Sequence, residues 1–326
     1  MINVAVIEGG YSHEKVVSLK SAQTILEHLD KSKYKVFRIR IDNDGWFFYS
    51  NDGKMFPVDK NDFSVEINGE KVNFDFAFIM IHGTPGEDGK LQGYFELLHI
   101  PYSTCNHLLT ALTFNKFVCN RLLADFGFSV AKAVMLNRGE AFDEDQIIQK
   151  IGLPCFVKPA DGGSSFGVTK VKEQSQLAEA IRFATEEGNG TQALIESFME
   201  GTEVSNGVYR NQSGIQVLPV TEIVSENEFF DFDAKYKGQS QEITPARISE
   251  EMTERIQWIT EQIYDKLELV GICRIDYIII GSEPHVIEIN TVPGMSGESI
   301  VPKMARAAEL PLPQLFDEVI TYAMKG

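Results

Sequence analysis

The sequence has few cysteines, no long apolar run and too little positive charge for several classes of function. Its 4 cysteines are scattered without a CxxC pair, which argues against a zinc site or a disulfide framework. No apolar stretch approaches the length of a membrane span, and the chain starts without the features of a signal peptide. With 30 Lys and Arg against 47 Asp and Glu, the net charge is −17, which disfavours nucleic-acid and anionic-membrane surfaces. We therefore expect a cytoplasmic protein that binds small molecules.

The order of strand and helix patterns predicts an α/β fold that becomes α+β in the C-terminal half. Apolar runs at Ile2–Glu8, Lys35–Ile41 and Phe74–Ile81 predict buried strands of an open parallel sheet, with a helix over Ser18–Leu29. Short strands around a Gly/Ser loop follow from about residue 104, and a long helix precedes a final strand pair. We predict three units that comprise residues 1–104, 105–195 and 196–326.

The strongest local signal is a predicted hairpin over residues 273–290 with a Gly/Ser/Pro turn at its middle. Such a turn places Asp276 opposite Glu288 and Arg274 opposite Asn290. Because alternate residues of a strand share a face, all four side chains then project together. Two carboxylates and an amide oxygen suit Mg²⁺, and Arg274 can balance charge and bind a developing anion.

Two glycine-rich loops bear on this interpretation. The loop at residues 291–297 follows the hairpin, and its glycines suggest that the backbone approaches a ligand closely. This favours a metal site on the hairpin over the alternative, an exposed hairpin face with a salt bridge. Lys158 ends a strand and precedes the Gly/Ser loop 162–167, which can hold a polyphosphate through N–H groups and hydroxyls. The lysine precedes the glycines, so the loop is not a Walker A motif. A mobile surface hairpin is the alternative.

Weaker signals stay open between a functional and a structural interpretation. The segment from Glu196 to Glu203 can line a nucleotide pocket or form a solvated turn. Glu14 can bind a substrate ammonium or serve as a first-turn helix acid. His82 is either a substrate contact or a satisfied histidine, and Lys116 by itself is typical of a solvated helix. No GxGxxG fingerprint follows the first strand, which disfavours a dinucleotide site.

Taken together and in this order, the segments resemble D-alanine–D-alanine ligases of the ATP-grasp superfamily. The matching segments are GGYSHEKVVSL, HGTPGEDGKLQG, VKPADGGSSFGVTKV, IESFMEGTE, FDFDAKY, GICRIDY and EINTVPGM. The resemblance implies a three-lobed ATP-grasp fold that uses ATP and two Mg²⁺ ions, with Mn²⁺ as a substitute. It also implies D-alanine as substrate, a homodimer and a role in peptidoglycan precursor synthesis.

The resemblance further implies a role for each matched residue. The catalytic residues are Glu14, Ser164, Tyr236, Arg274 and Gly294. The substrate contacts are Ser18 and His82, with the second D-alanine held by Ser299 and Ile300. ATP is held by Lys116, Lys158, Glu196, Phe198, Met199, Glu203 and Lys235. The metal ligands are Asp276, Glu288 and Asn290, and residues 225–245 form a lid.

The implied reaction forms an acyl phosphate from the first D-alanine, which the amine of the second D-alanine then attacks. Arg274 and a backbone N–H near Gly294 stabilise the oxyanion, and the lid excludes water. Alternatives are a D-alanine–D-lactate or D-alanine–D-serine ligase of the same fold, and a non-catalytic nucleotide-binding regulator. The Lys235-Tyr236 pair favours a D-alanine acceptor, and retention of the hairpin residues favours an enzyme. Glu298 adds an acid beside the expected second-substrate pocket.

Overall fold

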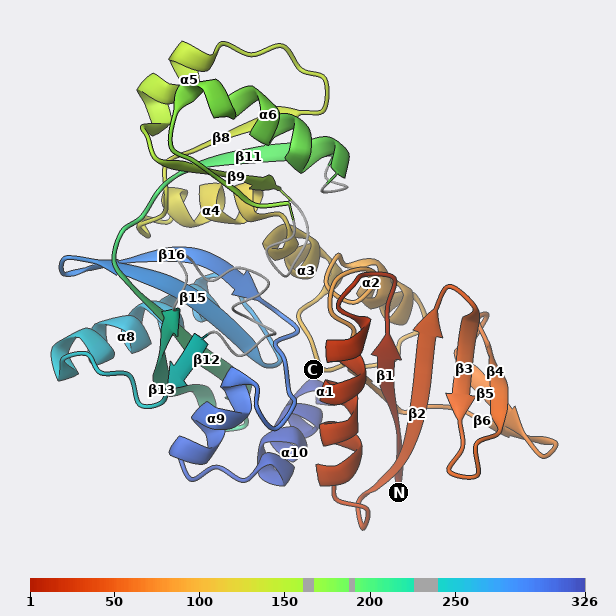
Figure 1. The fold of residues 1–326 in the computed structure, drawn as a ribbon. Coiled ribbons are helices and arrows are strands. Elements are labelled where there is room, and N and C mark those ends of the chain that lie inside the picture. The colour runs from red at the N-terminus through yellow and green to blue at the C-terminus, as the bar shows by residue number, and fades with distance from the viewer. Residues whose placement is uncertain (161–166, 188–190, 226–239, 326) are drawn as a thin grey trace.

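Three β-sheets with helices packed against them make up the protein, a mixed α/β architecture as the sequence predicts (Figure 1). The computed structural model describes residues 1–160, 167–187, 191–225 and 240–325. Figure 1 shows the N-terminal sheet at the right, a small central lobe at the top and the C-terminal sheet at the lower left. Within the described residues no helix is long and apolar enough to cross a membrane.

The N-terminal sheet combines a parallel centre with an antiparallel extension. β1 (Ile2–Gly9) pairs in parallel with β2 (Tyr34–Asp42) and β7 (Phe76–Ile79). The parallel sheet expected from the sequence holds for these strands alone, because short turns join the others into antiparallel hairpins. The hairpin strands are β3 (Gly45–Tyr49), β4 (Met55–Asp59), β5 (Ser64–Ile67) and β6 (Glu70–Val72), giving the order β6-β5-β4-β3-β2-β1-β7.

A glycine turn leads from β1 into the first helix. Gly9 has a φ of +107°, and a Cβ there would lie 2.3 Å from the backbone oxygen of Ile41, so only glycine fits. α1 then buries Ala22 and Ile25 against the sheet. The helices of this half of the chain are α1 (Lys15–His28), α2 (Lys90–Leu97), α3 (His107–Phe114) and α4 (Lys116–Asp125).

The central lobe is a four-stranded antiparallel sheet with its own hydrophobic core. Its strands, in the order β10-β9-β11-β8, are β8 (Ala133–Asn137), β9 (Cys155–Pro159), β10 (Thr169–Val171) and β11 (Gln192–Ser197). Val157, Leu177 and Ile195 are fully buried in that core. The covering helices are α5 (Glu144–Ile151), a 3-10 turn (Gln174–Gln176), α6 (Leu177–Arg182) and a π-helical turn (Phe183–Glu187).

The C-terminal sheet is antiparallel and carries the predicted hairpin at its edge. Its strands, in the order β14-β13-β12-β15-β16, are β12 (Thr202–Asn211), β13 (Gly214–Ser225), β14 (Ser240–Ile243), β15 (Cys273–Ile280) and β16 (Glu283–Asn290). α8 (Glu250–Lys266) begins at Ser249, whose side chain accepts from the Met252 N–H, and it buries Ile256 and Ile263 against one face. On the opposite face, Tyr209 of β12 and Leu218 of β13 belong to a different hydrophobic core.

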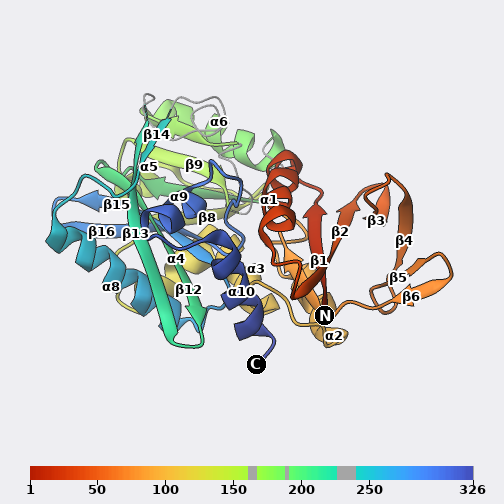
Figure 2. The same cartoon turned by 90° about the horizontal axis from the view of Figure 1, so that it is seen from below.

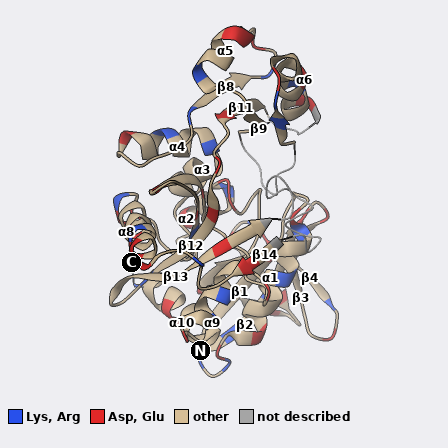
Figure 3. Cartoon of the chain, turned by 60° about the vertical axis from the view of Figure 1, so that its left-hand side comes forward, with Lys and Arg blue, Asp and Glu red and all other residues tan. Residues whose placement is uncertain are grey.

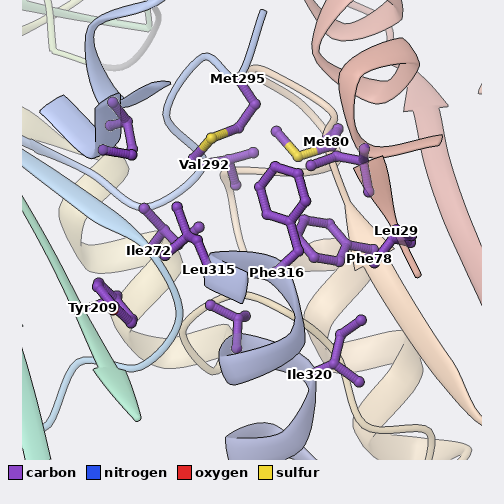
Figure 4. Close-up of a cluster of buried hydrophobic side chains, with 14 of the residues drawn as sticks. Leu29, Phe78, Met80, Tyr209, Ile272, Val292, Met295, Leu315, Phe316 and Ile320 are labelled. Atoms are coloured by element: carbon purple, nitrogen blue, oxygen red, sulfur yellow. The ribbon is translucent and has the colours of Figure 1, made fainter. Parts of the chain in front are cut away.

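A second core joins the N-terminal and C-terminal sheets through α9 (Ile300–Ala307) and α10 (Leu312–Ala323). Figure 4 shows Phe316 of α10 against Phe78 of β7, with ring centroids 5.7 Å apart. In Figures 1 and 2, α10 lies beside α1, and the Asp317 carboxylate accepts hydrogen bonds from Lys33 and the Tyr34 hydroxyl. The two sheets therefore form one continuous platform.

Candidate active site

A cavity of about 650 Å³ is lined by segments from distant parts of the chain. The loops after β1 and β7 meet the start of α4, the β15–β16 hairpin and the loop leading into α9. Many of the residues predicted from sequence line it together, namely Glu14, His82, Lys116, Arg274, Glu288, Asn290, Gly294, Ser299 and Ile300. The fold thus gathers nine of the predicted site residues around one space.

The hairpin has the predicted register on the side that faces the site. Arg274 pairs with Asn290 and Asp276 with Glu288, so the expected common face is confirmed. The register shifts directly after Asp276, where the extra residue in β16 is Ile287. This bulge places Val286 in the core, whereas regular alternation from Ile289 would place Ile287 there. Regular alternation fails beyond the bulge because one residue of β16 has no partner.

The Asp276 carboxylate is the centre of a hydrogen-bond network on this face. Arg274 donates to both of its oxygens, from Nε and Nη2, at 2.8 Å each. Asn290 Nδ2 donates at 3.0 Å, and the Ser205 hydroxyl of β12 donates at 2.6 Å. Burial lowers the pKa of Arg274, but Asp276 outweighs burial, so the pKa is raised and the guanidinium stays charged.

A second ion pair links α4 to the hairpin. Lys116 Nζ lies 3.2 Å from a Glu288 carboxylate oxygen, and both side chains are largely buried. Burial lowers the pKa of Lys116, but the Glu288 carboxylate outweighs burial and raises it overall. The position of Lys116 is fixed by Asn115, which caps α4 by accepting a hydrogen bond from the Val118 N–H at 3.0 Å. The lysine that looked ordinary in the sequence is therefore a cavity residue.

The N-terminal side of the cavity holds a neutral histidine and two acids. His82 is 6% exposed, and its Nε2 lies 3.3 Å from the Ser21 hydroxyl. Burial lowers the pKa of His82, so the ring is neutral near pH 7. Burial, followed by the Glu14 carboxylate, raises the pKa of Glu87 to about 8, although the carboxylate accepts the Gly83 N–H. Glu87 was not predicted, although it lies within the matching segment HGTPGEDGKLQG.

Ser18 differs from the other predicted substrate contacts. Its hydroxyl is fully buried and accepts the Gly9 N–H at 2.9 Å, so it supports the turn after β1. It is not among the residues that line the cavity. Its neighbour along the chain, Val17, does line the cavity.

The start of α9 closes the C-terminal end of the cavity. Ser299 is the N-cap residue of α9, and its hydroxyl lies 2.8 Å from the Ser296 hydroxyl. A Cβ on Gly294 would lie 2.9 Å from the Ser299 hydroxyl, so a side chain there would collide with the serine. Glu242 of β14 also lines this part and pairs with Lys303 at 3.0 Å, a contact that sequence reasoning missed. Glu298 also lines the cavity, although its side chain is 92% exposed.

Apart from Lys116, the predicted nucleotide residues that the structure describes do not line the cavity, and they lie mainly on the central lobe. Lys158 of β9 forms an ion pair with Glu196 of β11, and both side chains are largely buried. The Phe198 ring packs against Phe156, with Lys170 Nζ 4.1 Å from its centroid. Met199 follows Phe198 in the strand connection and Glu203 lies on β12. The predicted residues Ser164, Lys235 and Tyr236 lie outside the described residues.

The hairpin residues fit a magnesium ion. Two carboxylates and one amide lie on neighbouring strands, and Glu288 and Asn290 face the cavity. Within the described ranges no group of three His, Cys, Asp or Glu side chains clusters as a metal site. Mg²⁺ needs no such cluster, because it takes its other ligands from substrate phosphates and water. Charged residues of both signs are spread over the ribbon (Figure 3), so charge by itself does not mark the site.

Comparison with known proteins gives the same family over the whole chain. Models described as D-ala D-ala ligase N-terminus and C-terminus match residues 3–105 and 122–321. A D-alanine–D-alanine ligase of Parabacteroides distasonis is 50% identical over 99% of this chain and 98% of its own length.

Solved structures agree. The VanG D-Ala:D-Ser ligase from Enterococcus faecalis is 33% identical, with a TM-score of 0.86 over 98% of both chains. The D-alanine–D-alanine ligase from Bacillus anthracis complexed with ATP is 27% identical, with a TM-score of 0.79 over 100% of this chain and 98% of that one. Such ligases have the ATP-grasp fold. This chain belongs to the D-alanine–D-alanine ligase family.

Proposed function

We propose that this chain joins two D-alanine molecules with ATP, through a D-alanyl phosphate, and releases D-alanyl-D-alanine, ADP and phosphate. The dipeptide serves as a precursor for peptidoglycan synthesis. One observation carries the proposal: Glu14, from the loop after β1, lines a single cavity with Arg274 and Glu288 of the β15–β16 hairpin and with Ser299 at the start of α9. An acid for an ammonium, a cation for an oxyanion and oxygen donors for a metal are the groups that this reaction needs.

The donor D-alanine binds at the N-terminal side of the cavity. Glu14 accepts the substrate ammonium in an ion pair, and the neutral His82 orients the substrate without repelling the ammonium. Ser18 supports this part through the turn at Gly9. A carboxylate is a poor acyl donor, so the bound D-alanine is activated by transfer of the γ-phosphoryl group of ATP.

ATP lies between the central lobe and the C-terminal sheet. Lys116 and Lys158 neutralise its phosphates, and the adenosine is held by Glu196, Phe198, Met199 and Glu203. Asp276, Glu288 and Asn290 would hold two Mg²⁺ ions, or Mn²⁺, which when bound supply further neutralisation of the transferring phosphoryl group. Binding of a metal ion by Glu288 would break its ion pair with Lys116, which would then be available to the phosphates of ATP. The roles of the two lysines are supported by their ion pairs, Lys116 with Glu288 and Lys158 with Glu196.

The acceptor D-alanine binds at the start of α9, against Ser299 and Ile300. Its neutral amine attacks the acyl phosphate, and the oxyanion that forms is stabilised by Arg274 and a backbone N–H near Gly294. The raised pKa of Arg274 supports this role because the guanidinium keeps its charge throughout. From the family resemblance, Ser164 and Tyr236 help Glu14 to close the site, and Lys235 contacts the nucleotide.

Other parts of the proposal concern the whole protein. We place the unit boundaries at residues 1–104, 105–195 and 196–326, and we expect a cytoplasmic homodimer without nucleic-acid or membrane partners. One hydrophobic cluster confined to residues 1–104 and another confined to residues 134–195 support the division into units. Two further clusters cross the boundaries: one joins the first unit to the last, and the other packs residues 105–123 against the C-terminal sheet. Light scattering of the purified chain tests the dimer.

A D-alanine–D-serine ligase is the second candidate, because the solved enzyme with that activity is 33% identical to this chain. The 50% identity to a D-alanine–D-alanine ligase favours the first. The test is ADP release with D-alanine and Mg-ATP, followed by product analysis with D-alanine, D-serine and D-lactate offered together. We expect D-alanyl-D-alanine as the main product and no ADP release with L-alanine. A dominant D-serine or D-lactate product would contradict the proposed acceptor.

A further inference from the structure

We infer that Ser205 is a positioning residue for the metal ligand Asp276. Its hydroxyl holds one carboxylate oxygen in place, so that the other oxygen is presented to a divalent cation. The inference rests on the proposed function, because it takes Asp276 as a ligand.

The geometry of Ser205 is specific to this task. It lies on β12 directly opposite Asp276 of β15, and its Oγ donates to Oδ1 at 2.6 Å. Ser205 is 2% exposed and Asp276 is 7% exposed, so water does not compete for this bond. β12 is paired on both sides, with β13 and β15, which fixes the position of the serine.

The other donors to this carboxylate have tasks elsewhere in the proposed reaction. Arg274 must turn toward the oxyanion, and Asn290 must present its amide oxygen, not its NH₂ group, to the cation. Both changes remove hydrogen bonds from Asp276. The hydrogen bond from Ser205 can remain when Arg274 and Asn290 change partners, because Ser205 lies outside the hairpin and contacts only Oδ1 of Asp276. It is therefore the contact that orients Asp276 with and without the cation.

The test is the affinity of the purified full chain for Mn²⁺ in the presence of ADP, measured by electron paramagnetic resonance. Partners that orient metal ligands change metal affinity by roughly 10- to 100-fold, so Ser205→Ala is expected to weaken Mn²⁺ binding about tenfold. Ser205→Thr keeps the hydroxyl on a strand-compatible side chain and is expected to restore the affinity to within about threefold.

The matched control is Thr221→Val. Thr221 lies opposite Ser205 on β13, is fully buried, and pairs with the Thr244 hydroxyl at 2.6 Å. Removing this hydroxyl disturbs the same row of the sheet without touching Asp276, so Mn²⁺ affinity is expected to stay within about twofold. Melting temperatures of all variants separate loss of metal affinity from loss of folded protein.

Two outcomes overturn the inference by itself: Ser205→Ala that binds Mn²⁺ as the wild type does, or Thr221→Val that loses as much affinity as Ser205→Ala. A wild-type chain that binds no Mn²⁺ with ADP instead overturns the proposed metal site, and the inference with it. A selective loss in Ser205→Ala, restored in Ser205→Thr, supports both.

Discussion

The platform and the central lobe are held together in different ways. The core of the platform draws Phe78 from the N-terminal sheet and Phe316 from α10 at the other end of the chain. The core of the central lobe comes from residues 134–195 alone. Long-range packing therefore fixes the cavity residues of the platform relative to one another, whereas the lobe is a unit with its own contacts. Under the proposed function, the substrate residues and most of the nucleotide residues are therefore held in place by separate hydrophobic cores.

The ion pairs follow the same division. Lys158 and Glu196 pair within the lobe, whereas Lys116 of α4 pairs with Glu288 of the platform. The Lys116 backbone N–H also donates to Ala160 of the lobe at 3.0 Å. The start of α4 thus contacts both regions.

The largest expected effect distinguishes the acids of the two regions. Glu288→Gln, on the platform, keeps the side-chain shape but removes the negative charge of a proposed metal ligand, so we expect kcat to fall roughly 10³-fold. Glu196→Gln, on the lobe, is expected to raise the KM for ATP about tenfold with kcat within about threefold. Steady-state kinetics with varied ATP measures both. Equal effects of the two variants on kcat would break the comparison.

The next effect concerns stability. Phe316 is fully buried, and Phe316→Ala is expected to cost about 3–5 kcal/mol of unfolding free energy in the platform. Leu177→Ala, in the fully buried core of the lobe, is expected to cost about 2–5 kcal/mol but to act locally. Hydrogen exchange checks this: the second variant speeds exchange in β9 and β11 and leaves β1 and β7 protected. Faster exchange in all four strands would argue for a single cooperative unit.

The smallest effect separates the regions by pH. The pKa of Glu87 is raised to about 8, above its ordinary value of 4.5, so the folded platform holds a proton that the unfolded chain releases. Its contribution to stability is therefore complete below pH 4.5 and is lost as the pH rises through 8. The melting temperature should fall between pH 5 and pH 8, and we expect this fall to be smaller in Glu87→Gln than in the wild type by roughly 1–3 °C. Glu298→Gln, whose side chain is exposed, is the control and should leave the slope unchanged.

Sequence reasoning reached the features that depend on local alternation. Pairing across one turn fixed the register of Arg274 and Asp276 with their partners, because both strands are adjacent in sequence. The bulge at Ile287 was missed, since nothing in a β-rich run marks an unpaired residue. Ser205 was also missed, because it lies 71 residues from Asp276 and only strand order brings the two together.

The N-terminal half shows the same limit. Apolar runs predicted β1, β2 and β7, but strands β3 and β4, which join β2 to β5 by antiparallel pairing, were overlooked. The family resemblance supplied the roles of Glu14 and Lys116, which in isolation look like ordinary helix residues. Their importance follows from tertiary contacts that local patterns do not encode.

The central claim is that the cavity activates one D-alanine as an acyl phosphate. D-Alanine labelled with ¹⁸O in its carboxylate tests it most directly, because attack by the second amine expels phosphate that carries one carboxylate oxygen. We predict one ¹⁸O atom in each phosphate released, together with one ADP and one dipeptide. Phosphate without the label, or AMP in place of ADP, would contradict the claim.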